Sequence, residues 1–124
     1  MKQMVFLDTD IGTDPDDALC LSYLLKQSAC DLLGITTVGR NSNTRAQLAE
    51  IFIRYFNAEH TPIAAGADLP YFSTSYWFDH GVWQDTVLAE WPIKTEYEPG
   101  KAMELMLKVN RAHPSEVTLL AVGP

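Results

Sequence analysis

The sequence predicts a three-layer α/β fold in which helices cover a mainly parallel sheet. Apolar segments of strand length alternate with segments whose apolar residues recur every three or four positions. Their order, strand, helix, strand, helix, strand, is typical of parallel strands joined by right-handed crossovers. The chain has 124 residues, 47% of them hydrophobic, which is enough for the core of one domain over residues 1–124.

The first strand and helix are expected on either side of an acidic turn. Residues 5–7 (VFL) form an apolar run that predicts a buried strand. Residues 16–29 predict a helix, because apolar side chains recur there at helical spacing. These apolar positions are Ala18, Leu21, Leu24 and Leu25. A strand that runs through a turn into a helix is the first half of a crossover unit.

A second strand, a second helix and a third strand follow. Residues 32–38 (LLGITTV) are rich in β-branched residues, which favour a strand. Asn43 or Thr44 is expected to cap a helix that runs to about residue 56. Its apolar face is predicted at Ala49, Phe52, Ile53 and Phe56. Residues 62–65 (PIAA) then predict a short strand closed by a glycine.

The regular pattern is interrupted at residues 67–97, which carry all three tryptophans. So long an irregular segment predicts a functional loop or lid, and an aromatic cluster that attaches the segment to the domain is the alternative. A last helix is expected at about residues 101–112, and residues 117–122 (VTLLAV) predict another buried strand. Because doubly wound domains usually have more than four strands, we expect these residues to be the front part of a longer protein.

Charge and cysteine usage exclude several classes of protein. The net charge of −7 and a pI near 4.7 argue against a nucleic-acid or anionic-membrane partner, since both need clustered Lys and Arg. Cys20 and Cys30 match neither a zinc site nor a CxxC pair, so we expect buried free thiols. Residues 1–8 hold too short an apolar run for a signal peptide, and no segment approaches membrane-spanning length. These features predict a cytoplasmic protein.

The acidic turn is the most informative feature of the sequence. Helix capping and the first helical turn could account for Asp14, Asp16 and Asp17. No capping argument covers Asp8 and Asp10, which follow a strand at the end where open α/β sheets bind ligands. Clustered carboxylates repel one another unless a cation or protons are bound. The sequence therefore predicts a metal or catalytic site here.

Four segments in order along the chain resemble one enzyme family. Residues 8–18 (DTDIGTDPDDA) resemble the amino-terminal signature of the inosine-uridine type nucleoside hydrolases, with two extra residues before the final Asp-Asp. Residues 35–41 (ITTVGRN) and 62–67 (PIAAGA) are similar to the segments at the family's second and third strands. Residues 117–124 (VTLLAVGP) resemble the strand that leads into a metal-contacting loop. The resemblance implies the Rossmann-like nucleoside hydrolase fold.

The resemblance also implies an activity, a metal and a set of site residues. Members of the family hydrolyse the N-glycosidic bond of ribonucleosides, with a calcium ion at the bottom of the ribose pocket. By this resemblance Asp10 would ligate calcium and act as general base, and Asp17 would ligate calcium. Asp16 and Asn41 would bind ribose, and Asp8 would support the ligands. Because carboxylate oxygens suit calcium better than zinc, the residue types agree with this metal.

The chain also departs from the family pattern. Family members are longer, and their later part supplies another metal-binding aspartate, commonly preceded by a histidine that assists the leaving base. Neither has a counterpart here. His80 lies where the family has a loop near the nucleobase, and either a role at the base or a packing role is open to it. The family also suggests nucleoside salvage and a possible homo-oligomer.

Two other functions remain open at this point. The first is a haloacid-dehalogenase-like phosphatase, with Asp8 as nucleophile and Asp10 as acid. Those enzymes typically continue with Gly-Thr-Leu, whereas this chain continues with residues 11–17 (IGTDPDD). The second is an inactive, truncated relative that binds metal or ribose or serves as an interaction domain. Release of base from inosine, compared with hydrolysis of an aryl phosphate, separates the two enzymes.

Overall fold

The computed structural model of the chain describes residues 1–71 and 84–124. Within these ranges the strands are β1 (Gln3–Thr9), β2 (Cys30–Thr37), β3 (Ile63–Ala65) and β4 (Val117–Ala121). The helices are α1 (Pro15–Lys26), α2 (Ser42–Tyr55), α3 (Gln84–Glu90) and α4 (Ala102–Ala112). These elements confirm the predicted order of strands and helices and add one helix, α3, to it.

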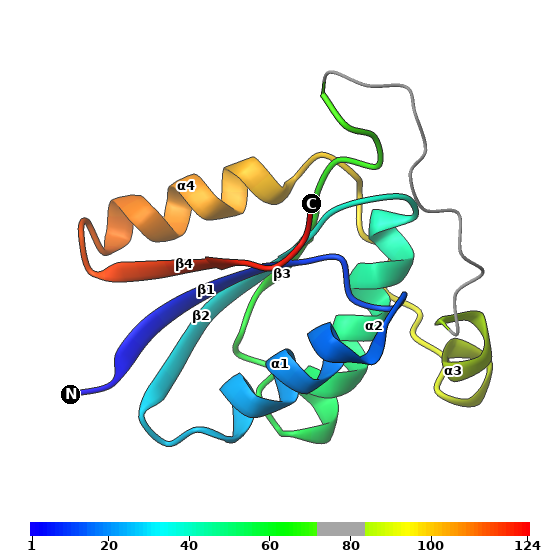
Figure 1. Ribbon diagram of the computed structural model, residues 1–124, viewed down its shortest axis with the longest axis horizontal. Helices are drawn as coiled ribbons and strands as arrows, with labels where there is room; N and C mark the ends of the chain where they lie inside the picture. The colour runs from blue at the N-terminus through cyan, green and yellow to red at the C-terminus, as the bar shows by residue number, and fades with distance from the viewer. Residues whose placement is uncertain (72–83) are drawn as a thin grey trace.

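The strands form one parallel sheet between two layers of helices. Their order is β3-β2-β1-β4, and every pair of neighbours is parallel. Figure 1 shows α1 and α2 on one face of the sheet and α4 on the other. Helix α3 packs against α2. The three-layer α/β fold with a parallel sheet is therefore confirmed.

The core lies between the sheet and the α1–α2 layer. β1 has a neighbour on both sides, so its alternate residues Val5 and Leu7 are buried under these helices. Leu7, Ile35 of β2 and Leu21 of α1 are completely inaccessible. The other buried members of this cluster are Ile11, Leu32, Leu48, Ala49, Ile53 and Ala58. The helical and strand periodicities of the sequence correctly predicted this face.

Two helix boundaries differ from the predicted ones. Helix α1 ends at Lys26, three residues early, because Gln27 leaves the helical conformation and the chain turns into β2. Helix α2 begins at Ser42 with Asn41 as N-cap, so the predicted cap at Asn43 or Thr44 is wrong. The backbone N–H of Ser42 donates to the Asp68 carboxylate (2.9 Å). A side chain distant in sequence thus satisfies the first turn of α2, which local sequence could not indicate.

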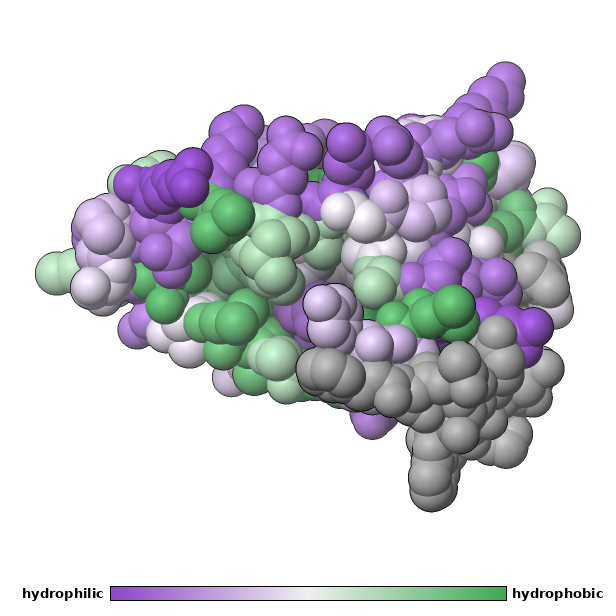
Figure 2. Space-filling model, turned by 90° about the horizontal axis from the view of Figure 1, so that it is seen from above, coloured by the Kyte–Doolittle hydropathy of each residue, from purple (hydrophilic) through white to green (hydrophobic). Residues whose placement is uncertain are grey.

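Strand β4 was predicted to be buried, and this prediction is wrong. Among the described residues β4 is an edge strand, and α4 packs mainly on β2 and β3. Leu119 is consequently 57% exposed, and Val122 and Met103 are exposed as well. Figure 2 looks onto the face that carries α4 and shows hydrophobic side chains gathered beside hydrophilic ones. The apolar sequence of β4 therefore does not by itself mean that β4 is buried by the described residues.

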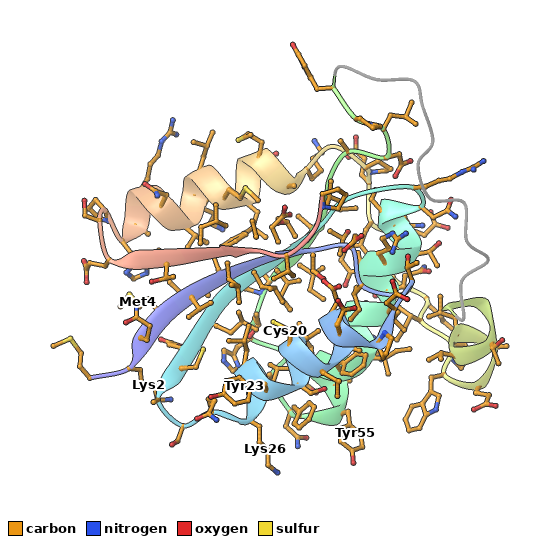
Figure 3. The ribbon with its side chains drawn as sticks, in the orientation of Figure 1. Lys2, Met4, Cys20, Tyr23, Lys26 and Tyr55 are labelled. Carbon is orange, nitrogen blue, oxygen red and sulfur yellow. The ribbon has the colours of Figure 1, made fainter. Side chains whose placement is uncertain are left out.

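The faces of α1 and α2 that point away from the sheet are exposed to solvent. Figure 3 shows Tyr23 and Lys26 of α1 and Tyr55 of α2 on the side away from the sheet. Cys20 packs against the core only in part, and Cys30 is likewise half-buried, so the two free thiols are less buried than predicted. No helix within residues 1–71 and 84–124 is long and apolar enough to cross a membrane.

A buried carboxylate attaches the segment after α3 to α2. Glu50 accepts hydrogen bonds from the hydroxyls of Tyr97 (2.7 Å) and Thr95 (3.1 Å) and pairs with Arg54. Burial by itself would raise the pKa of Glu50, but these hydrogen bonds outweigh it, so the pKa lies below its ordinary value. The irregular segment predicted for residues 67–97 thus contains both a helix and a polar anchor.

The core makes a first testable prediction. Leu7→Ala should lower the free energy of unfolding by about 2–5 kcal/mol, because Leu7 is fully enclosed and truncation leaves a cavity. Leu19→Ala is the matched control, since Leu19 of α1 is 68% exposed, and it should change the free energy by no more than about 0.5 kcal/mol. Urea unfolding followed by circular dichroism measures both values. Equal losses for the two variants would contradict the assigned core.

The Glu50 anchor makes a second prediction, which concerns pH. Because the folded-state pKa of Glu50 is lowered, its stabilising contribution is complete above its ordinary pKa of 4.5 and is lost as the pH falls through the folded value. Wild type should therefore exceed Glu50→Gln in unfolding free energy at pH 7, and the difference should shrink below pH 4.5. The exposed Glu59 provides the control, Glu59→Gln. A difference that stays constant from pH 7 to pH 3 would show that the Glu50 charge contributes nothing.

Candidate functional site

The ends of three strands meet at Asp10. The N–H of Val38, after β2, donates to the Thr9 carbonyl (3.0 Å), and the N–H of Val122, after β4, donates to the Asp8 carbonyl (2.9 Å). A Cβ on Gly123 would lie 3.2 Å from the Asp10 nitrogen. Figure 1 shows the C-terminus at the same end of the sheet as the turn from β1 into α1. Parallel strands thus bring their carboxyl ends to one place, as ligand sites in such sheets require.

Asp17 is the most buried carboxylate of this cluster. Only 8% of the residue is exposed, and the Thr9 hydroxyl donates to its Oδ1 atom. The Thr9 oxygen in turn accepts the N–H of Ile11 (3.1 Å). Burial raises the pKa of Asp17, the Thr9 hydrogen bond opposes this shift, and the charges of Asp10 and Asp16 add to it. The net shift is upward, because burial and the neighbouring charges together outweigh the hydrogen bond.

Asp8 is the second-last residue of β1, just before the acidic turn. It lies opposite Thr36 in the register of β1 and β2, and the Thr36 hydroxyl donates to Asp8 Oδ1 (2.6 Å). Burial raises the pKa of Asp8, the Thr36 hydrogen bond opposes the shift, and the Asp10 charge adds to it. Asp10 thus interacts electrostatically with both Asp8 and Asp17. The structure brings these three predicted residues together.

Arg45 places a buried positive charge beside these carboxylates. It lies in the first turns of α2, and only 6% of the residue is exposed. Its guanidinium donates to the carbonyls of Ile11 (3.0 Å) and Arg40 (3.0 Å) and to that of Asp10. Burial lowers the pKa of Arg45, whereas Asp10 and Asp17 favour its charged form. The two turns that carry the acidic residues and Asn41 are therefore joined by one side chain.

The other predicted residues have less definite surroundings. Asp16 is exposed in the first turn of α1, next to Asp17. Asn41 is the exposed N-cap of α2, with a left-handed backbone (φ 63°). Within the described ranges no hydrogen bond joins the Asn41 side chain to the carboxylates. Asp14 occupies the predicted N-cap position of α1, but its side chain makes no capping hydrogen bond, since the residue is exposed where water can be its partner. His80 lies outside the described residues.

The carboxylates match calcium in chemistry but not in number. Asp8, Asp10 and Asp17 offer only oxygen ligands, which hard cations prefer. Yet in the part of the chain that the structure describes, no group of three or more His, Cys, Asp or Glu side chains could hold a metal ion. Within the described residues these carboxylates therefore do not by themselves form a complete metal site.

Sequence reasoning did not identify Thr9, Thr36 and Arg45 as parts of the site. Each Thr lies at a strand end next to or opposite an aspartate, where a hydroxyl can donate to it. Arg45 is an arginine between apolar positions of a helix, four residues after Asn41, which could have signalled a buried cation. Which carbonyls it would reach depends on how α2 packs against the turns, and sequence spacing does not contain this information.

Comparison with known proteins identifies the family. The sequence profile of the inosine-uridine preferring nucleoside hydrolases matches residues 5–124. The chain belongs to this family. A search of curated protein sequences found no match to this chain. The family match also weighs against the phosphatase alternative, because the signature with Asp8 and Asp10 falls within the matched residues.

Solved structures agree with the fold of this nucleoside hydrolase family member. A plant nucleoside hydrolase, PpNRh1, is 25% identical over 100% of the chain, with a TM-score of 0.70. A purine-preferring ribonucleoside hydrolase from Gardnerella vaginalis is 17% identical over 98%, with a TM-score of 0.73. An inosine-guanosine nucleoside hydrolase is 17% identical over 99%, with a TM-score of 0.65. The chain spans 40%, 40% and 38% of the lengths of these three proteins.

The hydrogen bond from Thr9 to Asp17 leads to a third testable prediction. Thr9→Val should lower the unfolding free energy by about 1–3 kcal/mol at pH 7, because a buried carboxylate loses its donor, whereas Thr9→Ser keeps the hydroxyl and should lose less. The Thr9 hydrogen bond lowers the pKa of Asp17, so its removal raises that pKa further. The cost exists where Asp17 is ionised and should shrink as the pH falls through this pKa. Urea unfolding at pH 7 and pH 4 measures it, and similar losses for Val and Ser would contradict the assigned role.

Proposed function

We propose that the protein hydrolyses the N-glycosidic bond of ribonucleosides and releases the free base and ribose. One observation carries the proposal: Asp10 interacts electrostatically with Asp8 and with Asp17 where three parallel strands end, in a chain that matches the nucleoside hydrolase family over residues 5–124. A partly buried acidic cluster of this kind can take up a proton and can stabilise a developing positive charge.

In the proposed reaction Asp10 is the general base. Its half-buried carboxylate accepts a proton from water, and the water oxygen forms a bond to the anomeric carbon of the ribose. The bond from that carbon to the base nitrogen breaks, and its electron pair leaves with the base, which then takes up a proton. The sugar passes through a cation-like state that the negative charges of Asp10 and Asp17 stabilise. No side-chain nucleophile is needed.

Calcium is the cofactor that we propose for this site. Asp10 and Asp17 would hold it through their carboxylates, together with ligands from other residues or from the substrate. A bound calcium ion would favour ionisation of water and orient ribose hydroxyls. The surroundings of Asp8 and Asp17 support this proposal: burial, and to a smaller extent the charge of Asp10, raise both pKa values, and a bound cation would stabilise the ionised carboxylates.

The remaining residues would bind the substrate or support the ligands. Asp16 is exposed beside Asp17 and could accept a hydrogen bond from a ribose hydroxyl. Asn41 lies at the end of the turn that Arg45 joins to Asp10, so its amide could bind ribose beside the aspartates. Asp8 would steady the turn through Thr36. We also propose that the protein works in the cytoplasm, in purine or pyrimidine salvage, with no nucleic-acid or membrane partner.

A second candidate is an inactive relative that binds metal or ribose. It is favoured by the lack, within the described residues, of a third carboxylate or imidazole positioned for a metal. A site without a final ligand and a leaving-group acid loses two contributions, each commonly worth about 10²-fold or more in rate.

The proposed function makes a fourth prediction. The natural full-length protein should release base from inosine or uridine, and a calcium chelator should slow this release. Asp10→Asn should lower the rate by about 10²-fold or more, because the general base is lost. Asp14→Asn is the matched control, since Asp14 lies in the same turn but is exposed and makes no capping hydrogen bond. Chromatography of the free base measures the rate of release for wild type and for both variants.

The 124-residue chain by itself should show little or no turnover in the same assay. Rapid, calcium-dependent release by this chain would mean that its own residues, or those of a second copy, complete the site. No release by the full-length protein, with calcium binding retained, would instead favour the inactive relative. Hydrolysis of an aryl phosphate in place of a nucleoside would favour the phosphatase.

A further inference from the structure

Arg45 is a buried cation whose guanidinium donates mainly to backbone carbonyls. It donates to four acceptors, which are the carbonyls of Asp10, Ile11 (3.0 Å) and Arg40 (3.0 Å) and the hydroxyl of Thr13 (3.2 Å). Three of them belong to the turn between β1 and α1, and one belongs to the turn between β2 and α2. A single guanidinium therefore connects two turns that are about thirty residues apart in sequence.

The acceptors lie next to the predicted site residues on both turns. Asp10 accepts through its own carbonyl, and the carbonyl of Arg40 directly precedes Asn41. Gly39 closes the arrangement: a Cβ there would lie 3.8 Å from Arg45 Nε and 3.9 Å from the Asp10 Cβ. Its backbone is left-handed (φ +87°), which glycine adopts without strain. The two turns thus approach each other with Arg45 in contact with both.

The charge of Arg45 acts on the carboxylates without binding them. Among the described residues no carboxylate forms an ion pair with its guanidinium, yet Asp10 and Asp17 are close enough to favour its charged form. A direct bidentate ion pair would cover the oxygens that a cation or a water molecule needs. Here the guanidinium contacts main-chain oxygens and leaves those carboxylates to other partners.

We propose that Arg45 is a positioning residue, whose guanidinium holds the turn with Asp10 and the turn with Asn41 in one arrangement while leaving the carboxylates available to calcium and water. This inference rests on the proposed function. It assigns no contact with substrate to Arg45. Its physical basis is that the planar guanidinium can donate in several directions at once, whereas a lysine ammonium is a compact point charge.

The test compares Arg45→Lys with wild type in the full-length protein. The variant keeps the positive charge but cannot reach both turns with a planar group, so the two turns should open more often. Two amides report on them: the Ile11 N–H, which donates to Thr9 Oγ1 (3.1 Å), and the Gly39 N–H, which donates to the Ala67 carbonyl (3.0 Å). Hydrogen exchange at both should accelerate together, by about tenfold or more in the absence of metal.

Two further measurements distinguish positioning from a purely structural role. Calorimetric titration with calcium chloride should show an affinity about 10- to 100-fold weaker in Arg45→Lys, as expected when a group behind a ligand is altered. For inosine hydrolysis kcat should fall by about 10- to 100-fold with little change in KM, because a base misplaced by about 1 Å loses rate more than substrate binding. Arg54→Lys is the matched control, since Arg54 lies on the same helix and pairs with Glu50.

Each outcome decides the inference. Wild-type exchange, calcium affinity and kcat in Arg45→Lys would overturn it, and so would faster exchange with unchanged affinity and kcat. If Arg45→Lys does not fold, Thr13→Val removes one acceptor of the same group and should shift the same three measurements in the same direction by smaller factors. A wild-type protein that neither binds calcium nor releases base would overturn the proposed function and, with it, the positioning role.

Discussion

The structure depends on the concentration of carboxylates where β1 ends. Two like charges about 4 Å apart repel by about 4 kcal/mol at an effective dielectric constant near 20, and a hydrogen bond to a charged group returns about 1.5–3 kcal/mol. Thr36 and Thr9 each supply one such bond, to Asp8 and Asp17 respectively. The pKa of both carboxyls is nevertheless raised, first by burial and further by the charge of Asp10. This cost is an argument for the proposed cation site, since a bound cation would offset it.

The fold brings these groups together through the direction of its strands. All neighbouring strand pairs are parallel, so the chain leaves β1, β2 and β4 at the same edge of the sheet. A side chain is excluded where the segment after β4 approaches the segment after β2: a Cβ on Gly123 would lie 2.6 Å from Val38 Cγ1. Arg45 then sets the distance between the turns from the side of α2. The parallel strands and Arg45 thus bring together both the turns and the charged residues of the candidate site.

Regions away from the site show where the described residues form a closed structure and where they do not. On the α2 side, Glu50 binds Tyr97 and Thr95, and this buried network attaches the chain before α4 to the domain. On the other side, β4 has an exposed edge and an exposed Leu119. The known structures that share this fold are more than twice as long as this chain.

The amino-acid sequence by itself determined the fold class, the order of the strands and helices, and the concentration of acidic residues after the first strand. These features are local: periodicity over a few residues decides between helix and strand, and Asp8 and Asp10 are neighbours in the chain. Only the tertiary structure decided that β4 is exposed, that Asn41 caps α2, and that Arg45 contacts the turn before α1. Such features depend on residues 26–35 positions apart, as with Asp68 at Ser42 and Arg45 at Asp10, and their pairing follows from how the elements pack. No local pattern encodes that packing, because burial and hydrogen-bond partners are properties of the assembled chain.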